Sequence, residues 1–119
     1  MIGLALLWFA ASQPATPETC GGEILQKLEW RRHPSASEME RLQPVRTGLP
    51  ARAETEMLCR ADRDGRLVGC ALIREEPAGF AFGEALLRAA EFFRAPPNDI
   101  EGMPLGDRCM SVRMIWVYE

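Results

Sequence analysis

Cysteine and histidine are the residue types in this 119-residue chain that could support metal or redox chemistry. Cys59, Cys70, Cys109 and His33 could together supply the four ligands of a zinc site. However, the chain has no C-x2-C pair, and ten residues, "RADRDGRLVG", separate Cys59 from Cys70. The missing C-x-x-C motif also argues against a redox site. We therefore expect neither a bound metal nor a cofactor.

Acid–base and nucleophilic candidates are also poorly placed for catalysis. Glu75 and Glu76 are neighbours in a predicted strand, so their carboxylates should point to opposite faces. Ser35 has the spacing of a helix capping box with Glu38, and no pattern pairs it with a base and an orienting acid. His33 lies in the charged stretch "EWRRHPS", where a solvated or capping role is expected. Nothing in these residues supports catalysis, so we do not expect an enzyme.

The composition is typical of one small soluble domain. Hydrophobic residues make up 47% of the chain and charged residues 26%, which is the balance of an ordinary folded protein. The net charge of -3, without a dense run of arginines, argues against nucleic acid as a partner.

The first twelve residues, "MIGLALLWFAAS", contain no charged side chain. Their apolar run is too short to span a bilayer, which takes about 20 residues, and has the length of a signal-peptide core. We interpret residues 1–12 as a signal peptide cleaved near Ser12 and expect a periplasmic protein. The alternatives are a misplaced start codon and a buried helix. Residues 13–29 are then a flexible leading segment, and residues 30–119 form the domain.

Export would place the four cysteines in an oxidising compartment, where an even number favours disulfide bonds. Three pairings are open, and the sequence alone does not choose between them. We favour Cys59–Cys70, with Cys20–Cys109 as the second bridge. The alternative for Cys59 and Cys70 is a pair of buried free thiols.

The favoured bridge depends on the turn between two predicted strands. If Asp64 and Gly65 form a two-residue turn, Cys59 directly faces Cys70 across a hairpin. If Gly65 is instead the bulge of a three-residue turn, the two cysteines are offset by one residue. The bridge is therefore expected only with the two-residue turn.

Hydrophobic periodicity predicts a small α+β domain. The expected order is helix, strand, strand, helix, strand, with an antiparallel hairpin and an amphipathic helix packed on one face of the sheet. Besides a short helix over Glu23–Trp30, the predicted elements are a helix capped by Ser35 and stopped by Pro44, strands at 54–62 and 66–75, a helix with a core stripe of Phe82, Leu86, Ala89, Ala90 and Phe93, and a closing strand over Met110–Tyr118.

Several stretches carry a resemblance to a known family. They are "WRRHPSASEME", "LQP", "DRDGRL", "EEPAGFAFGEALLRAAEFFRAPP", "EGMPLGD" and "VRMIWVY". From Trp30 to Tyr118 the chain resembles the C-terminal domain of TonB-type energy transducers. It is most similar to the subset with one cysteine on each strand of the hairpin.

The resemblance implies a TonB C-terminal-like fold and a periplasmic binding module. Domains of this family add an extended segment of an outer-membrane transporter to a sheet edge, and they transmit force from an inner-membrane motor complex. The closing strand would provide that edge, and pairing of two copies along it is a further expectation. The implied partner-binding residues are Met110, Val112, Arg113, Met114, Ile115, Trp116, Val117 and Tyr118.

The chain also departs from the family pattern. We see no full transmembrane anchor or long Pro-rich spacer before the domain, and Gln43-Pro44 stands where a Tyr-Pro pair is common. An alternative hypothesis is therefore a stand-alone periplasmic structural or adaptor domain without a transport role.

Overall fold

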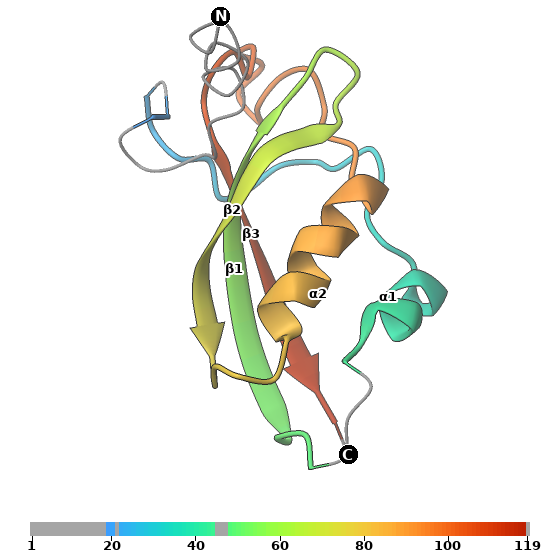
Figure 1. The fold of residues 1–119 in the computed structure, drawn as a ribbon. Coiled ribbons are helices and arrows are strands. Elements are labelled where there is room, and N and C mark those ends of the chain that lie inside the picture. The colour runs from blue at the N-terminus through green and yellow to red at the C-terminus, as the bar shows by residue number, and fades with distance from the viewer. Residues whose placement is uncertain (1–18, 21, 45–47, 119) are drawn as a thin grey trace, which may run out of the picture.

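Three antiparallel strands in the order β2-β1-β3 form the sheet of the computed structural model (Figure 1). The structure describes residues 19–20, 22–44 and 48–118, so the predicted signal peptide lies outside the described residues. The elements are α1 (Ala36–Leu42), β1 (Arg52–Ala61), β2 (Leu67–Glu76), α2 (Phe82–Ala89), the 3-10 turn η2 (Ala90–Phe92) and β3 (Met110–Val117). This confirms the predicted α+β class, the hairpin and the closing strand at a sheet edge.

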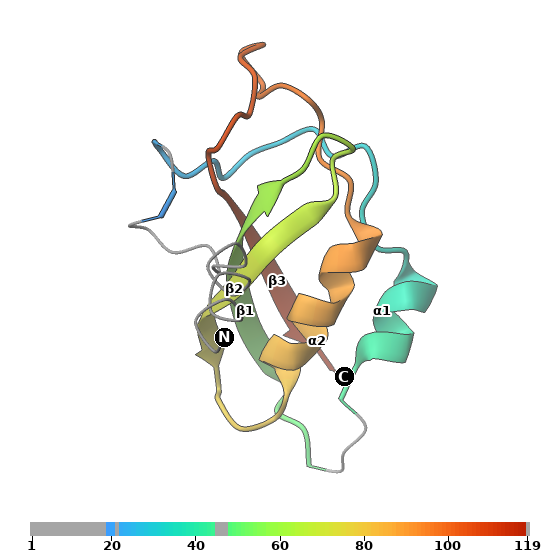
Figure 2. The same ribbon diagram turned by 45° about the horizontal axis from the view of Figure 1, so that its top comes forward.

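Both helices lie on the same side of the sheet, with α2 against the strands and α1 beside α2 (Figures 1 and 2). The predicted apolar stripe of α2 and η2 is the core: Phe82, Leu86 and Ala89 are fully buried. Burial alternates along β3, because Val112 and Trp116 are buried whereas Arg113, Ile115 and Val117 are exposed. The sheet therefore has an inner face toward the helices and an outer face away from them.

Local side-chain caps define where both helices begin. Ser35 Oγ accepts a hydrogen bond from the Glu38 amide, and the Glu38 carboxylate accepts one from the Ser35 amide. This reciprocal pair is the predicted capping box. The cap of α2 comes from β2 instead: Glu75 Oε2 accepts from the Gly83 amide at 2.7 Å. A carboxylate at this position also opposes the positive end of the helix dipole. Glu75 thus caps the N-terminus of α2, whereas Arg74 and Glu76 form an ion pair on the outer face of the sheet.

The predicted helix over Glu23–Trp30 is wrong. This segment is extended, and Leu25 forms an isolated parallel bridge with Met110. Leu25 packs into the core beside Met110, whereas Ile24 packs on the other side against Leu58. Neighbouring residues that bury opposite faces follow the two-residue period of a strand. Tertiary pairing here overrides a weak local helix preference.

The expected two-residue hairpin turn is also wrong. The Asp62 amide donates to Arg66 O at 2.9 Å and the Gly65 amide donates to Asp62 O at 3.0 Å. These bonds close a three-residue turn with Gly65 in the left-handed region at φ +82°.

A second irregularity restores the cysteine pairing. Arg60 pairs with Val68 and Leu58 pairs with Ala71, so two residues of β2 oppose Cys59. Those residues are Gly69 and Cys70, which form a β-bulge next to the pair. Cys59 and Cys70 consequently form a disulfide with a Cα–Cα distance of 4.1 Å. The pairing is confirmed, although the turn condition attached to it was mistaken.

The tip of the hairpin docks on the chain that follows η2. The Ala95 amide donates to Gly65 O at 2.7 Å. A Cβ atom added to Gly65 would lie only 2.4 Å from Ala95 O. Gly65 therefore meets two demands at once: a left-handed backbone and a close approach by another backbone segment.

We predict that Gly65→Ala lowers the free energy of unfolding by more than about 2 kcal/mol, since the left-handed conformation alone costs roughly 1–2 kcal/mol. Gly106→Ala is the matched control, because Gly106 has φ +56° but no atom within 4 Å of its added Cβ. Chemical denaturation of the oxidised proteins gives both values. Equal losses for the two variants would show that the contact with Ala95 contributes nothing.

Candidate functional site

The outer edge of β3 is the candidate site, because part of it presents unpaired backbone groups. The Tyr118 amide donates to Ala51 O toward β1, while the Ser111 amide donates away from β1 to Leu25 O. Because backbone direction alternates along a strand, Arg113, Ile115 and Val117 direct their N–H and C=O groups away from β1. Within the described part of the chain, no backbone segment pairs with these three residues.

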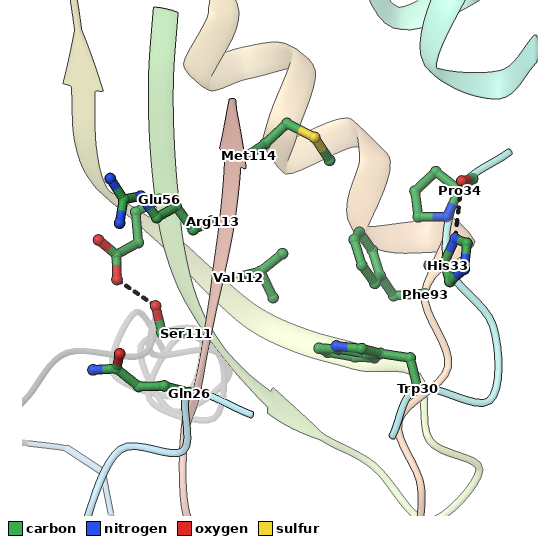
Figure 3. Close-up of a pocket in the computed structure, with 10 residues that line it drawn as sticks. All are labelled: Gln26, Trp30, His33, Pro34, Glu56, Phe93, Ser111, Val112, Arg113 and Met114. Atoms are coloured by element: carbon green, nitrogen blue, oxygen red, sulfur yellow. Dashed lines mark hydrogen bonds between the residues drawn. The ribbon is translucent and has the colours of Figure 1, made fainter. Parts of the chain in front are cut away.

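A groove of about 570 Å³ runs along this edge (Figure 3). β1 and β3 form one side of it, and the chain between Leu25 and Ser35 forms the other. The lining residues are Gln26, Trp30, His33, Pro34, Glu56, Phe93, Ser111, Val112, Arg113 and Met114.

The part of the groove that faces the helices, its inner side, differs in chemistry from the part that faces away from them, its outer side. On the inner side, the half-buried Trp30 packs edge-on against Phe93 at a centroid distance of 4.9 Å, next to Val112 and Met114. On the outer side lie Gln26, Glu56, Ser111 and Arg113, where Ser111 Oγ donates to the Glu56 carboxylate. An extended chain in the groove would therefore meet apolar surface on one face and polar groups on the other.

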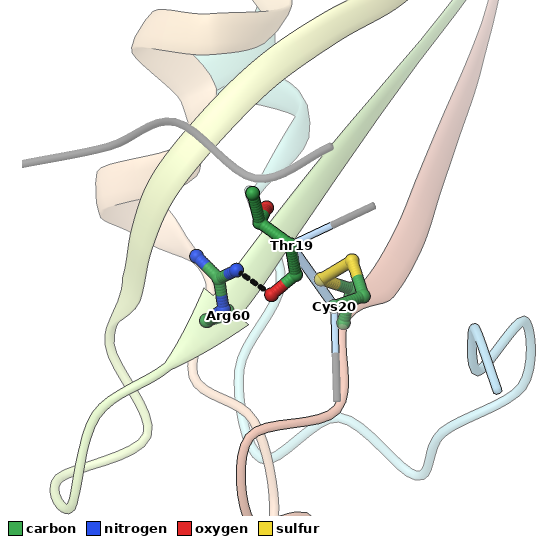
Figure 4. Close-up of a disulfide and its surroundings, with 4 residues drawn as sticks. Thr19, Cys20 and Arg60 are labelled. Carbon is green, nitrogen blue, oxygen red and sulfur yellow. Dashed lines mark hydrogen bonds between the residues drawn. A yellow bond between two sulfur atoms is a disulfide. The ribbon is translucent and has the colours of Figure 1, made fainter. Parts of the chain in front are cut away.

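The leading segment closes one end of this edge. The Leu25 amide donates to Cys109 O at 2.9 Å, and Leu25 O accepts from the Ser111 amide at 2.8 Å. The Cys20–Cys109 disulfide, with a Cα–Cα distance of 5.4 Å, holds this segment covalently and confirms the second expected pairing. Arg60 also donates to Thr19 O beside the bridge (Figure 4).

Of the eight residues expected to bind a partner, some are buried and others are accessible at this edge. Met110 is fully buried beneath Leu25, and Val112 is buried in the core. Trp116 donates from Nε1 to Thr55 Oγ1 at 3.0 Å, so its side chain belongs to the core and is not offered to a partner. The ring of Tyr118 packs at 6.0 Å from Phe82. The remaining residues at the open edge are Arg113, Met114, Ile115 and Val117.

Sequence reasoning missed the opposite wall of the groove. Gln26, Trp30 and His33 precede β3 by about eighty positions, and only the tertiary fold brings them alongside it. The sequence carried no clear signal for this wall, because Ile24 and Leu25 are both apolar and their burial on opposite sides of an extended segment appears only in the structure.

The two edges of the sheet are not equivalent. The pairing of β2 with β1 is interrupted by register shifts at Glu56/Met57 and at Leu58/Arg60. The pairing of β3 with β1 runs without a shift from Arg52↔Val117 to Cys59↔Met110. Bulges twist an edge and hinder pairing with another strand, so β3 is the better template.

A charged network covers the outer face next to the edge. Glu54 pairs with Arg113 at 2.9 Å, Arg74 at 3.0 Å and Arg52 at 3.3 Å. The hydrogen bond from Arg113, followed by that from Arg52, holds the pKa of Glu54 below its ordinary value. Glu76 and Glu54 in turn raise the pKa of Arg74.

The polar residues considered for chemistry are not brought together. Ser35 and Glu75 cap two different helices, and His33 Nδ1 lies 3.2 Å from Pro34 O at the surface. Among the described residues, no group of three or more His, Cys, Asp or Glu side chains could hold a metal ion. No helix within the described ranges has the length and apolar character needed to cross a membrane.

Comparison of the chain with protein-family models, with curated proteins and with solved structures gave no match. The groove and the edge therefore have to be interpreted from their own geometry.

We predict that Cys20→Ala with Cys109→Ala loosens the closed end of the edge. A disulfide lowers the chain entropy of the unfolded state. By this effect Cys20–Cys109, which closes the longer loop, contributes about 4–5 kcal/mol of stability, and Cys59–Cys70 contributes about 3 kcal/mol. The Ser111 amide should exchange at least tenfold faster in this double variant, as measured by NMR hydrogen exchange. In the control pair Cys59→Ala with Cys70→Ala, any acceleration at Ser111 should be no greater than at other β3 amides. Unchanged exchange at Ser111 would mean that Leu25 holds its place without the bridge.

Glu54→Gln should change how stability depends on pH. Because folding lowers the pKa of Glu54, the ionised carboxylate stabilises the protein above the ordinary glutamate pKa of about 4.3, and this contribution disappears as pH falls. The variant should be less stable than the parent at pH 7, and the difference should shrink toward pH 2–3. Denaturation at several pH values measures it, with Glu40→Gln on the exposed side of α1 as control. A difference that persists at low pH would contradict the role of the charge.

Proposed function

We propose that the protein is an exported binding domain of TonB C-terminal type. It takes up an extended segment of an outer-membrane transporter on the free edge of β3 and so contributes to energy-dependent transport. The observation that carries this proposal is the row of outward backbone groups at Arg113, Ile115 and Val117 beside the groove. Such a row is a template for β-strand addition.

Other features support the same interpretation. The resemblance spans Trp30 to Tyr118, and the strand that it implicates is the one with the regular, partly open edge. The two disulfides are compatible with export to an oxidising compartment.

The open part of the β3 edge offers few backbone hydrogen bonds, and this limits how tightly it can bind an added segment. Three residues can exchange up to about six backbone hydrogen bonds, each contributing roughly 0.5–1.5 kcal/mol net. Ordering the backbone of a five-residue segment costs about 1–2 kcal/mol per residue. The two contributions nearly cancel, so the contact is weak unless side chains add to it. A weak, reversible contact suits a domain that engages a transporter transiently, with an inner-membrane motor complex as the source of force.

A photo-crosslinker on each edge of the sheet tests the proposal in the cells that make the protein. p-Benzoylphenylalanine in place of Val117, which is 65% exposed beside the β3 edge, should crosslink to an outer-membrane transporter. The same group in place of Val68, 43% exposed on β2, is the control and should not. Mass spectrometry identifies the product and the crosslinked segment.

Crosslinks from position 117 solely to a second copy of the chain would indicate edge-paired dimers instead. Equal crosslinking from both positions, or none to any transporter, would argue for the structural or adaptor role.

A further inference from the structure

We infer that the groove selects its segment through one large apolar side chain, which enters the inner side between Trp30 and Met114. This inference rests on the proposed function, because it names what an added strand must carry. The occupant is an extended peptide segment of another protein, with a phenylalanine-sized side chain on the face toward the helices.

Leu25 shows how this edge holds an added residue. Its N–H and C=O bond to Cys109 and Ser111, and its side chain is only 8% exposed within the core. The chain leaves the edge after Leu25, so the inner-facing positions opposite Val112 and Met114 continue the same row without an occupant among the described residues. The proposed segment would extend an interface that the protein already uses.

Strand geometry fixes which face the selected side chain occupies. A residue opposite Val112 or Met114 shares their face, because directly opposed residues in a sheet point the same way. Val112 and Met114 face the helices, where Trp30 and Phe93 form the far wall (Figure 3). The selected side chain therefore meets two aromatic rings and the apolar side chains of Val112 and Met114.

The outer face offers no comparable selection by charge. Three of its arginines, Arg52, Arg74 and Arg113, are engaged with Glu54, and a fourth, Arg60, donates to Thr19 O. Glu76 also pairs with Arg74, and Glu56 accepts from Ser111 Oγ. Ion pairs at an exposed surface are also weak. Discrimination between segments is thus assigned to the apolar side of the groove.

Two synthetic peptides provide the test: acetyl-Lys-Thr-Thr-Thr-Xaa-Thr-Thr-Thr-Lys-amide, with Xaa either Phe or Ala. Each contains at most one large apolar side chain, and threonine favours an extended chain. NMR titration of the oxidised protein follows the amides of Arg113, Ile115 and Val117 and the indole N–H of Trp30. We expect the Phe peptide to bind at least tenfold more tightly, with NOEs from its ring to Trp30 and Met114.

Three protein variants separate the contributions. Trp30→Leu keeps an apolar contact with Phe93 and should reduce the preference for Phe to less than threefold. Gln26→Ala, on the polar side of the same groove, should leave the preference unchanged. N-methylation of the Ile115 amide, introduced by ligation of a synthetic fragment at Cys109, removes one outward donor and should weaken both peptides.

The possible failures are distinguishable. Equal binding of both peptides, with amide shifts at Arg113, Ile115 and Val117, would overturn the inference and leave strand addition intact. The inference would also fall if the Phe preference survives in Trp30→Leu, or if the Phe ring shows NOEs elsewhere. Absence of shifts at all three edge amides with either peptide would overturn both the inference and the proposed function. The comparison of the two peptides and the NOEs from the Phe ring are both measured on the protein without substitutions, so they do not depend on any effect of the substitutions on folding.

Discussion

The pairing of β3 with β1 is the interaction on which the rest of the structure depends. It joins the end of the chain to the hairpin and places Val112 and Trp116 against the helices. It also uses the backbone groups on one side of β3, so the groups at Arg113, Ile115 and Val117 are left facing outward. The same alternation that builds the core therefore creates the edge that we propose as the binding site.

The two disulfides lie near the same end of the sheet, where Cys59 pairs with Met110, but they tie different elements to it. Cys59–Cys70 ties β1 to β2, where the pairing is irregular, and Cys20–Cys109 ties the leading segment to the start of β3. A three-stranded sheet with a short helix layer has a modest core, and covalent links compensate for its size. The second bridge has a further effect: it holds Leu25 on the edge and so limits the open part to the stretch after Ser111.

Much of the fold could be predicted from the sequence. The capping box at Ser35, the stripe of α2 and the alternation of β3 are local patterns, and each appears in the structure as expected. The hairpin turn could not be predicted, because "DRDG" is compatible with both two-residue and three-residue loops. Two bulges, one at Gly65 and one at Gly69, shift the register of the hairpin in opposite senses and so cancel. Only the tertiary structure shows this, through the docking of Gly65 on Ala95 and the pairing of the cysteines.

The candidate site, like the fold, could be predicted from the sequence only in part. By itself, the sequence indicated the closing strand "MSVRMIWV" and the face on which each of its side chains lies, and the resemblance singled out this strand as the proposed binding edge. Only the tertiary structure decided which of its residues are accessible: Trp116 turns into the core, Met110 lies beneath Leu25, and Trp30 becomes the far wall of the groove. The physical reason is that alternation assigns a side chain to a face, whereas burial depends on which distant segment covers that face.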